Sequence, residues 1–229
     1  MESKIIVPNH IGFIMDGNGR WAKKQGKPRN YGHQKGADKV EDVVTWCFEA
    51  GVKYVSLYAF SCENWGRPKE EVDKIISLLV KFLKKYTKTL IKNEIRLVVS
   101  GDISVFDSDI IESIKKAEEL TSHFKERTLN IAINYGGRQE IVSAVNNLID
   151  KGEAVSIESL SNQLAVRGIP DIDLVVRTSG EIRISNFYLW QIAYAELYFT
   201  DVLWPDFSKE EFENALIWYS NRNRRFGKL

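Results

Sequence analysis

Cysteine and long apolar runs are both scarce in this chain. Among 229 residues only Cys47 and Cys62 are cysteines, and their spacing fits neither a disulfide framework nor a zinc motif. No run of 18 apolar residues occurs, so no segment is expected to span a bilayer. Charges at Glu2, Lys4 and Asp16 argue against a signal-peptide core. These absences predict a cytoplasmic protein in a reducing compartment, whose contact with a membrane would be limited to the surface.

A strong net charge is also missing. Lys and Arg number 32 and Asp and Glu number 31, so the whole molecule has no field that would steer nucleic acid or an acidic membrane toward it. Arg222, Arg224 and Arg225 could be read as a basic tail, but the neutral bulk charge and the lack of an aromatic platform disfavour that reading. We therefore expect no nucleic-acid partner, and any basic site must be local.

Short apolar runs alternate with longer segments of helical periodicity. The runs expected to be strands are 11–15, 54–60, 96–100, 129–134, 174–177 and 197–200. The segments expected to be helices are 32–50, 69–92, 108–124, 138–148, 157–166 and 209–222. Strands without strict polar alternation are typical of a parallel sheet that is covered on both faces. We predict a single α/β domain over residues 1–229, with a mainly parallel central sheet of about six strands flanked by helices.

The stretch after the first predicted strand combines a carboxylate, a turn and a cation. Asp16 ends the strand, Gly17, Asn18 and Gly19 follow, and Arg20 comes next. Ligands bind beyond the carboxyl ends of strands in such sheets, and free backbone N–H groups, a helix start and a guanidinium all suit phosphate. A carboxylate among these donors is consistent with Mg²⁺ bound between it and a diphosphate. A solvated strand-to-helix turn is the alternative, with Asp16 and Asn18 serving turn chemistry.

Two shorter patterns in the same region indicate other functions, and both are weak. Gly17-x-Gly19-x-x-Ala22 matches a loose dinucleotide fingerprint, which would predict an oxidoreductase, but the next strand offers only the late acid Glu63 for the ribose. Gly26-Lys27 resembles the end of a P-loop, but proline follows where that motif requires Ser or Thr.

Two further loops leave strand ends with polar side chains. After the second strand, residues 58–68 offer a hydroxyl, a carboxylate, an amide, an indole and a guanidinium. After the fifth strand, Arg177, Arg183 and Ser185 could meet a second anionic group. Taken alone, Trp65 could be a lid on the core and the 177–185 stretch a solvated loop. Because parallel strands end at one edge of a sheet, three such loops together favour a phosphate site.

The longest motifs carry a resemblance to a known family. They are HIGFIMDGNGRWAKKQG, YAFSCENWGRP, NYGGR at 134–138, DLVVRTSGE and RISNFYLWQIAYAELYFTDVLWPDF. In this order and length they resemble the cis-prenyltransferases, with bacterial undecaprenyl diphosphate synthases as the most similar branch, from about His10 to Gly227. The resemblance implies a Mg²⁺-dependent homodimeric transferase. It would condense isopentenyl diphosphate units onto farnesyl diphosphate as far as the undecaprenyl length, and so make the lipid carrier precursor for cell-wall polysaccharide.

The resemblance also implies roles for individual residues. Asp16 matches a catalytic carboxylate that holds Mg²⁺, and Glu196 matches a second metal-associated carboxylate. The cradle of the allylic diphosphate is matched by Gly17, Asn18, Gly19 and Arg20, with Trp21, Arg29 and His33 beside it. A mobile loop that closes over both substrates is matched by Ser61, Cys62, Glu63, Asn64, Trp65 and Arg67. The isopentenyl diphosphate pocket is matched by Arg177, Arg183, Ile184 and Ser185.

The implied chemistry leaves the proton acceptor open. Asn64 fits a catalytic proton-relay role, together with Ser61 and His33, but a phosphate of the substrate could equally take the proton. Arg225-Phe226-Gly227 matches a tail that crosses the dimer interface. A long hydrocarbon product also implies an apolar tunnel, for which the candidates are Ala37, Val40, Val44, Leu57, Ala59 and the helix over 72–90. Its release implies a transient contact with a membrane surface.

The chain departs from the family pattern at a few positions. Ser179 stands where glycine is usual, Cys62 where serine is common, and Ile182 where histidine is often found; none of these changes removes a phosphate-binding group. Some members of the superfamily are non-catalytic partner subunits, which typically lack the metal carboxylate and part of the cradle. That reading remains the alternative. A trans-type prenyltransferase is disfavoured, because the chain has no Asp-Asp pair from which its metal motif could be built.

Overall fold

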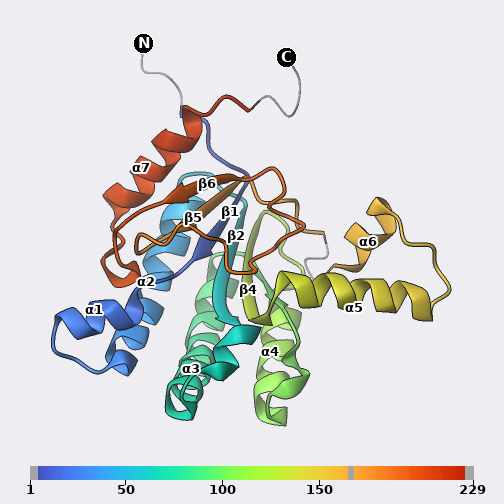
Figure 1. The fold of residues 1–229 in the computed structure, drawn as a ribbon, viewed down its shortest axis with the longest axis horizontal. Helices are drawn as coiled ribbons and strands as arrows, with labels where there is room; N and C mark the ends of the chain where they lie inside the picture. Colours follow the sequence, from blue (N-terminus) through green and yellow to red (C-terminus); the bar gives the residue numbers. More distant parts are fainter. Residues whose placement is uncertain (1–4, 165–167, 225–229) are drawn as a thin grey trace.

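The computed structural model describes residues 5–164 and 168–224, and its architecture is a parallel sheet between a helical layer and an irregular layer (Figure 1). The six-stranded sheet has the order β3-β4-β2-β1-β5-β6, and every pair of neighbours is parallel. The strands are β1 His10–Ile14, β2 Tyr54–Ser61, β3 Ile95–Ser100, β4 Arg127–Tyr135, β5 Leu174–Arg177 and β6 Glu196–Phe199. The predicted parallel sheet is confirmed.

The helices follow the predicted ones closely, with one addition. They are α1 Asn18–Lys24, α2 Arg29–Glu49, α3 Lys69–Lys92, α4 Ser108–Thr121, α5 Gly137–Asp150, α6 Ile157–Gln163 and α7 Lys209–Ser220. The sequence analysis expects a helix start after the glycine turn but gives it no range, and α1 is only seven residues long. It predicts the helix over 157–166 as longer than α6, and residues 165–167 of that prediction lie outside the described part of the chain.

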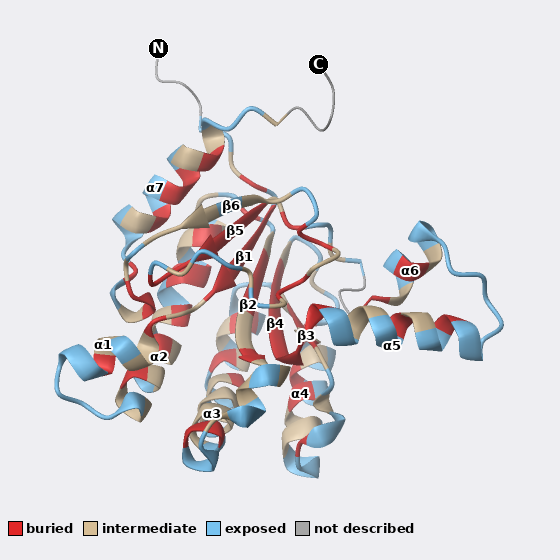
Figure 2. Ribbon diagram, viewed as in Figure 1, coloured by how far each residue is buried: buried red, intermediate tan, exposed pale blue. Residues whose placement is uncertain are grey.

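The larger core lies between the sheet and the helical layer. Its fully buried strand residues include Ile11, Phe13 and Leu57, which pack with apolar side chains of α2, α3 and α7 (Figure 2). The other face is covered by the irregular segment 184–195, for which the sequence pattern predicts no element. Phe187 and Tyr188 of this segment are completely buried against β4 and β5. Aromatic burial therefore covers the second face where a helix is absent.

A close crossing of α1 and α2 fixes the turn after β1. Gly17 precedes α1 with a φ of 102°, in the left-handed region that favours glycine. On α2, a Cβ at Gly32 would lie 2.0 Å from the backbone oxygen of Asn18, and one at Gly36 would lie 2.0 Å from the Asn18 side-chain oxygen. The two helices can approach this closely only because α2 presents glycine. The start of α1 is thus held at the edge of the sheet.

A buried polar network runs across the middle of the sheet from His10. The His10 ring lies 2.7 Å from the Pro170 carbonyl through Nδ1 and 2.8 Å from the Ser56 hydroxyl through Nε2. Because a carbonyl can only accept, Nδ1–H donates to Pro170 and Nε2 accepts from Ser56. Asn130 donates to Ser56 and to the Tyr188 hydroxyl, which connects the network to the second face. His10 packs at the start of β1 and is neutral.

His10 makes the fold sensitive to acid. Burial lowers the pKa of His10 from 6.5 to about 4, against weaker effects of Pro170 and Asp173 that raise it. Below pH 6.5 the His10 side chain is protonated in the unfolded chain but stays neutral in the folded one. The free energy of unfolding therefore falls as the pH falls toward 4. The loss from this residue is on the order of 3 kcal/mol. Urea unfolding between pH 7.5 and 5 should show about 2 kcal/mol of this loss, and His10→Gln should flatten it. Equal slopes for the two proteins would contradict the assignment.

Candidate active site

A polar cavity of about 520 Å³ opens at the carboxyl edge of the sheet. β1, β2 and β5 all end there, because the register pairs Ile14 with Arg177 and Phe13 with Leu57. The predicted site residues that line the cavity are Asp16, Gly17, Asn18, Gly19, Arg20, Arg29, His33, Ser61, Asn64, Arg67, Arg177, Arg183 and Ser185. The structure therefore brings residues from all three predicted loops to one cavity.

Asp16 is held as a carboxylate by cations and a backbone donor. Its Oδ2 lies 3.0 Å from Nη2 of Arg177 and 3.3 Å from Nη2 of Arg20, and its Oδ1 accepts from the Gly17 N–H at 2.6 Å. Burial alone would raise the pKa of Asp16, but the hydrogen bonds from Arg177 and Gly17 and the charges of Arg177 and Arg20 together lower it. A partly exposed, ionised carboxylate at the mouth of a cavity suits a divalent cation shared with substrate phosphates.

Arg177 is the most deeply placed cation of the cavity. Its side chain is 4% exposed, and Nη1 donates to Ser185 Oγ at 2.8 Å and to the Arg183 carbonyl. Its Nε is buried and makes no hydrogen bond among the described residues. A buried guanidinium with an unused donor is costly unless another acceptor joins it. Arg177 is thus prepared to receive a further anionic oxygen.

Two more cations of the cavity, Arg20 and Arg183, form ion pairs with Glu181, a residue that the sequence pattern did not indicate. Glu181 lies 2.9 Å from Nη1 of Arg20 and also pairs with Arg183. Arg20 donates in addition to Ser179 Oγ at 2.6 Å, so the serine that replaces the usual glycine contacts the cradle. Ser179 itself has a φ of 80°, the left-handed region in which glycine is favoured. An anionic ligand in the cavity would compete with Glu181 for both arginines.

Glu71 is the main functional residue that sequence reasoning missed. Its carboxylate accepts from Arg29 at 3.1 and 3.2 Å, contacts His33 Nε2 at 3.0 Å and accepts from Arg67 at 3.1 Å. Burial would raise the pKa of Glu71, but the hydrogen bonds from Arg29 and His33 and the nearby charges lower it. The i,i+4 spacing from Arg67 was a visible signal. The contacts with α2 were not, because they join residues about forty positions apart.

His33 is neutral in this cluster. Burial lowers the pKa of His33, the contact with Glu71 opposes this shift, and the charges of Arg67 and Arg29 lower it further. Because a carboxylate only accepts, the neutral ring carries its proton on Nε2 and donates it to Glu71. Its Nδ1 is then an acceptor. Glu71 thus fixes the tautomer as well as the position of the ring.

The loop after β2 is anchored to segments beyond the cavity. Asn64 Oδ1 accepts from the Ser61 backbone N–H at 3.1 Å, so its amide caps the short 3₁₀-helix Cys62–Gly66. Glu63 accepts from Asn186 at 2.9 Å. Trp65 donates to Asn134 Oδ1 at 2.8 Å and is 43% exposed, so it is not a sealed lid on the core. Cys62 donates to the Asn134 carbonyl. The predicted loop residues therefore divide between cavity and outer face.

Several predicted site residues do not line the cavity. They are Trp21, Cys62, Glu63, Trp65, Ile184 and Glu196. Trp21 stacks on Tyr31 and donates to Asp206 at 2.6 Å, and Ile184 packs against the core on the second face.

Glu196 lies at the far end of the sheet from Asp16. It begins β6, pairs in register with Leu174, and binds Nε of Arg222 at 3.0 Å. Leu174 in turn pairs with Ile11, five residues before Asp16, so the two carboxylates are separated by roughly 16 Å along the strands. Within one chain they cannot bind the same ion. The described residues contain no group of three or more His, Cys, Asp or Glu side chains placed to hold a metal.

An apolar cavity, and beyond it a cavity of mixed apolar and polar lining, continue from the polar one along the helical layer. The first, of about 120 Å³, shares Asn18, His33 and Ala59 with the polar cavity. The second, of about 210 Å³, shares Val40 and Phe82 with the first. The tunnel candidates Ala37, Val40, Leu57 and Ala59 line the first, and Val40 and Val44 line the second. Val72 and Leu83 of the predicted tunnel helix line neither and belong to the core.

A parallel α/β sheet with an acid, a glycine turn and arginines at its carboxyl edge, beside an apolar cavity, is the architecture expected of an enzyme that handles prenyl diphosphates. Residues 14–227 match the family model described as "Putative undecaprenyl diphosphate synthase". The chain belongs to this family, and it is a transferase.

Relatives along the whole chain support the assignment. The isoprenyl transferase of Fusobacterium nucleatum is 50% identical over 221 residues, or 96% of each chain. The (2E,6E)-farnesyl-diphosphate-specific ditrans,polycis-undecaprenyl-diphosphate synthase of Escherichia coli K12 is 49% identical over 225 residues, 95% of this chain and 89% of that protein.

Solved structures agree with the fold. Lavandulyl diphosphate synthase from Lavandula x intermedia, in complex with dimethylallyl diphosphate, has a TM-score of 0.92 at 32% identity, over 97% of this chain and 99% of that one. An undecaprenyl diphosphate synthase from Campylobacter jejuni, described as probable, has a TM-score of 0.83 at 35% identity, over 97% and 100%.

Proposed function

We propose that this chain elongates prenyl diphosphates in the cis sense, adding isopentenyl diphosphate units to farnesyl diphosphate to give undecaprenyl diphosphate. One observation carries the proposal: an ionised Asp16 and the buried Arg177 meet in the wall of a polar cavity that adjoins an apolar one. This pairing suits a molecule with a diphosphate head and a hydrocarbon tail. The Escherichia coli relative is named for the same primer and the same product.

The residues of the cavity divide the chemistry between two diphosphates. The backbone N–H groups at the start of α1 and Arg20 would bind the allylic diphosphate, and Arg177, Arg183 and Ser185 would bind the isopentenyl one. Asp16 would hold Mg²⁺, which neutralises charge that develops on the leaving diphosphate. As the carbon–oxygen bond of the allylic substrate breaks and its diphosphate departs, the double bond of isopentenyl diphosphate forms the new carbon–carbon bond. A proton of that unit then passes either to the Asn64 relay or to a phosphate oxygen of the substrate. Arg177, which Asp16 and Ser185 already hold in place, would stabilise the charge on the leaving diphosphate with little reorganisation.

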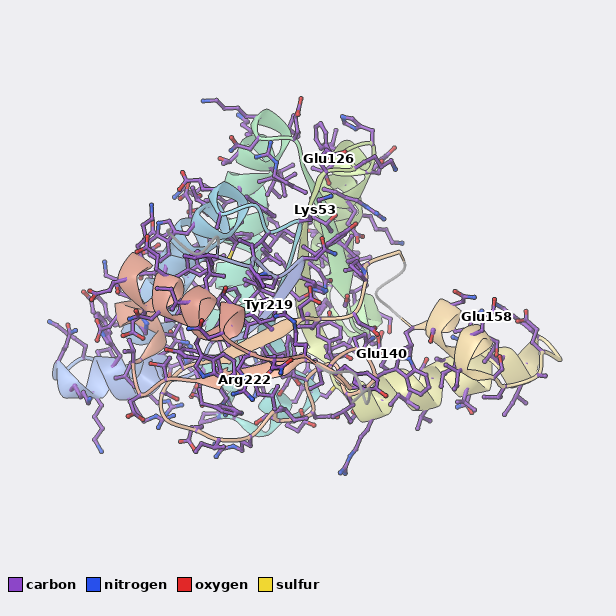
Figure 3. All side chains as sticks on the ribbon, turned by 90° about the horizontal axis from the view of Figure 1, so that it is seen from above. Lys53, Glu126, Glu140, Glu158, Tyr219 and Arg222 are labelled. Carbon is purple, nitrogen blue, oxygen red and sulfur yellow. The ribbon has the colours of Figure 1, made fainter. Side chains whose placement is uncertain are left out.

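A homodimer is part of the proposal. The arm of α5 and α6 stands away from the sheet (Figure 3, where Glu158 marks α6), and it exposes Val142, Ile149 and Ile157 by 59%, 62% and 78%. Apolar surface of this kind is typical of a protein interface. The separation of Glu196 from Asp16 also favours a role for Glu196 at a contact with a second copy. The predicted Arg225-Phe226-Gly227 tail lies outside the described residues.

The test is incorporation of labelled isopentenyl diphosphate with farnesyl diphosphate as primer. Butanol-extractable product of long chain length, present with Mg²⁺ and absent with EDTA, supports the synthase. A folded dimeric protein that makes no product would instead support the alternative of a non-catalytic partner subunit. That alternative is disfavoured because Asp16, Arg20 and Arg177 are all present and assembled.

The apolar cavities predict where product length is controlled. Ala37 lines the first apolar cavity, so Ala37→Phe should fill part of its 120 Å³ and stop elongation early, with shorter products at similar initial rates. Chain-length analysis of the extracted lipid checks this, and Ala154→Phe on an exposed loop is the control. Products of unchanged length from Ala37→Phe would exclude this route for the hydrocarbon.

A further inference from the structure

The outer face of α3 carries a stripe of lysines. Between residues 74 and 92 the helix contains no Asp or Glu and six lysines, at 74, 81, 84, 85, 88 and 92. At 3.6 residues per turn these six fall within an arc of about 100° and along about 27 Å of helix. The apolar side chains of the core, such as Leu83 and Leu90, lie on the opposite side. The chain as a whole has a net charge of only +1, so this stripe is a local concentration of charge.

These lysines are not neutralised within the protein. Five of them, all but Lys74, are exposed. In the part of the chain that the structure describes, none of the six forms an ion pair, while Lys69 at the start of the same helix pairs with Asp73. Lys85 donates to the Tyr86 hydroxyl, and the carboxylates of Asp38 and Glu41 lie near it. Carboxylates are therefore absent from the stripe itself and present only at its edge.

The opposite side of the same helix segment lines the apolar cavity and the cavity of mixed lining beyond it. Phe82 borders both of them, and Tyr86 and Leu90 border the second, which is the more distant from Asp16. A growing hydrocarbon that fills the cavities in series would thus reach the part of α3 that carries the lysines. The lysine stripe and the side chains that line these cavities therefore lie on two sides of the same helix.

We propose that the lysine stripe of α3, residues 74–92, docks this enzyme on the surface of an anionic phospholipid bilayer. Lysines near an anionic membrane each contribute to binding at the surface, and the attraction fades with salt. No helix of the described residues is long and apolar enough to cross a membrane, so the contact is peripheral. The inference rests on the proposed function, because a lipid product gives the contact its use.

A nucleic-acid partner fits the stripe less well. The stripe contains no arginine and no exposed aromatic side chain. Proteins that bind single-stranded nucleic acid use the guanidinium groups of arginine and aromatic side chains on which bases stack. Lysine acts as a point charge, which suits a diffuse anionic surface.

The experiment is sedimentation of the full chain with vesicles. Wild type should pellet with phosphatidylglycerol–phosphatidylcholine vesicles at low salt, less so at 0.5 M NaCl, and not with phosphatidylcholine alone. The variant with Lys81, Lys84, Lys88 and Lys92 all changed to Gln should bind about tenfold more weakly or worse. The matched control changes four exposed lysines elsewhere, Lys24, Lys27, Lys151 and Lys209, to Gln. It loses the same charge and should keep most of the binding.

Four results would overturn the docking proposal. These are failure of wild type to bind the anionic vesicles, equal binding to neutral vesicles, equal losses in the two lysine variants, or binding to a single-stranded oligonucleotide in place of vesicles. Turnover in detergent keeps this test separate from the proposed function. The α3 variant should retain wild-type incorporation there, because the four lysines do not line the polar cavity. Absence of activity in the wild type would count against the synthase without deciding the vesicle result.

Discussion

Asp16→Asn is expected to lower kcat/KM by about a thousandfold or more. The substitution keeps the size of the side chain but removes the charge that would bind Mg²⁺ beside the diphosphate. Metal stabilisation of a leaving group is worth several kcal/mol, and each 1.36 kcal/mol is tenfold in rate. The measurement is the initial rate of incorporation of labelled isopentenyl diphosphate over a range of substrate concentrations, repeated at several Mg²⁺ concentrations.

The control for Asp16 must separate chemistry from folding. Arg177 is buried and loses its carboxylate partner in the variant, which also destabilises the fold. Thermal unfolding should therefore be recorded, and activity should be compared below the transition. Asp73→Asn, which changes an exposed carboxylate paired with Lys69 on α3, should remain close to wild type. A folded Asp16→Asn protein with more than about a tenth of normal activity would contradict a metal-binding role.

Glu71→Gln is expected to lower kcat/KM by about a hundredfold. The carboxylate accepts hydrogen bonds from Arg29 and Arg67 and holds His33. A glutamine has one acceptor oxygen, and its NH₂ group would face the N–H donors that Glu71 now accepts from. These donor groups repel one another, so the cations would move apart. Hydrogen bonds to charged groups are worth about 1.5–3 kcal/mol, which corresponds to a loss of this size. KM for the two diphosphates and kcat should be measured separately.

Glu70→Gln is the matched control, since Glu70 lies in the same first turn of α3 and is exposed. If Glu71 positions the cations, it alone should change the pH dependence of activity, because Glu71 opposes the downward shift of the His33 pKa. With Glu71 replaced, the pKa of His33 should fall further, and any limb of the profile due to His33 should move to lower pH. Equal kinetics and equal profiles in the two variants would show that Glu71 has no positioning role.

The sequence by itself determined the class of fold and the three loops of the site. Apolar runs without polar alternation, separated by helical periods, are sufficient for a parallel sheet, because each strand must be buried on both faces. Strand ends then place Asp16 and Arg177 at one edge. Although the two residues are 161 positions apart in the chain, Nη2 of Arg177 lies 3.0 Å from Oδ2 of Asp16. The long motifs were enough to indicate the family.

Only the tertiary structure decided which side chains share the site. Local patterns show spacing along one element, so they could not reveal that Glu71 on α3 joins Arg29 and His33 on α2. Nor could they show that Glu196 lies with Arg222 at the far end of the sheet, or that an irregular aromatic segment covers the second face. These contacts depend on how elements pack across many residues of sequence, and packing is fixed by the whole core rather than by any single motif.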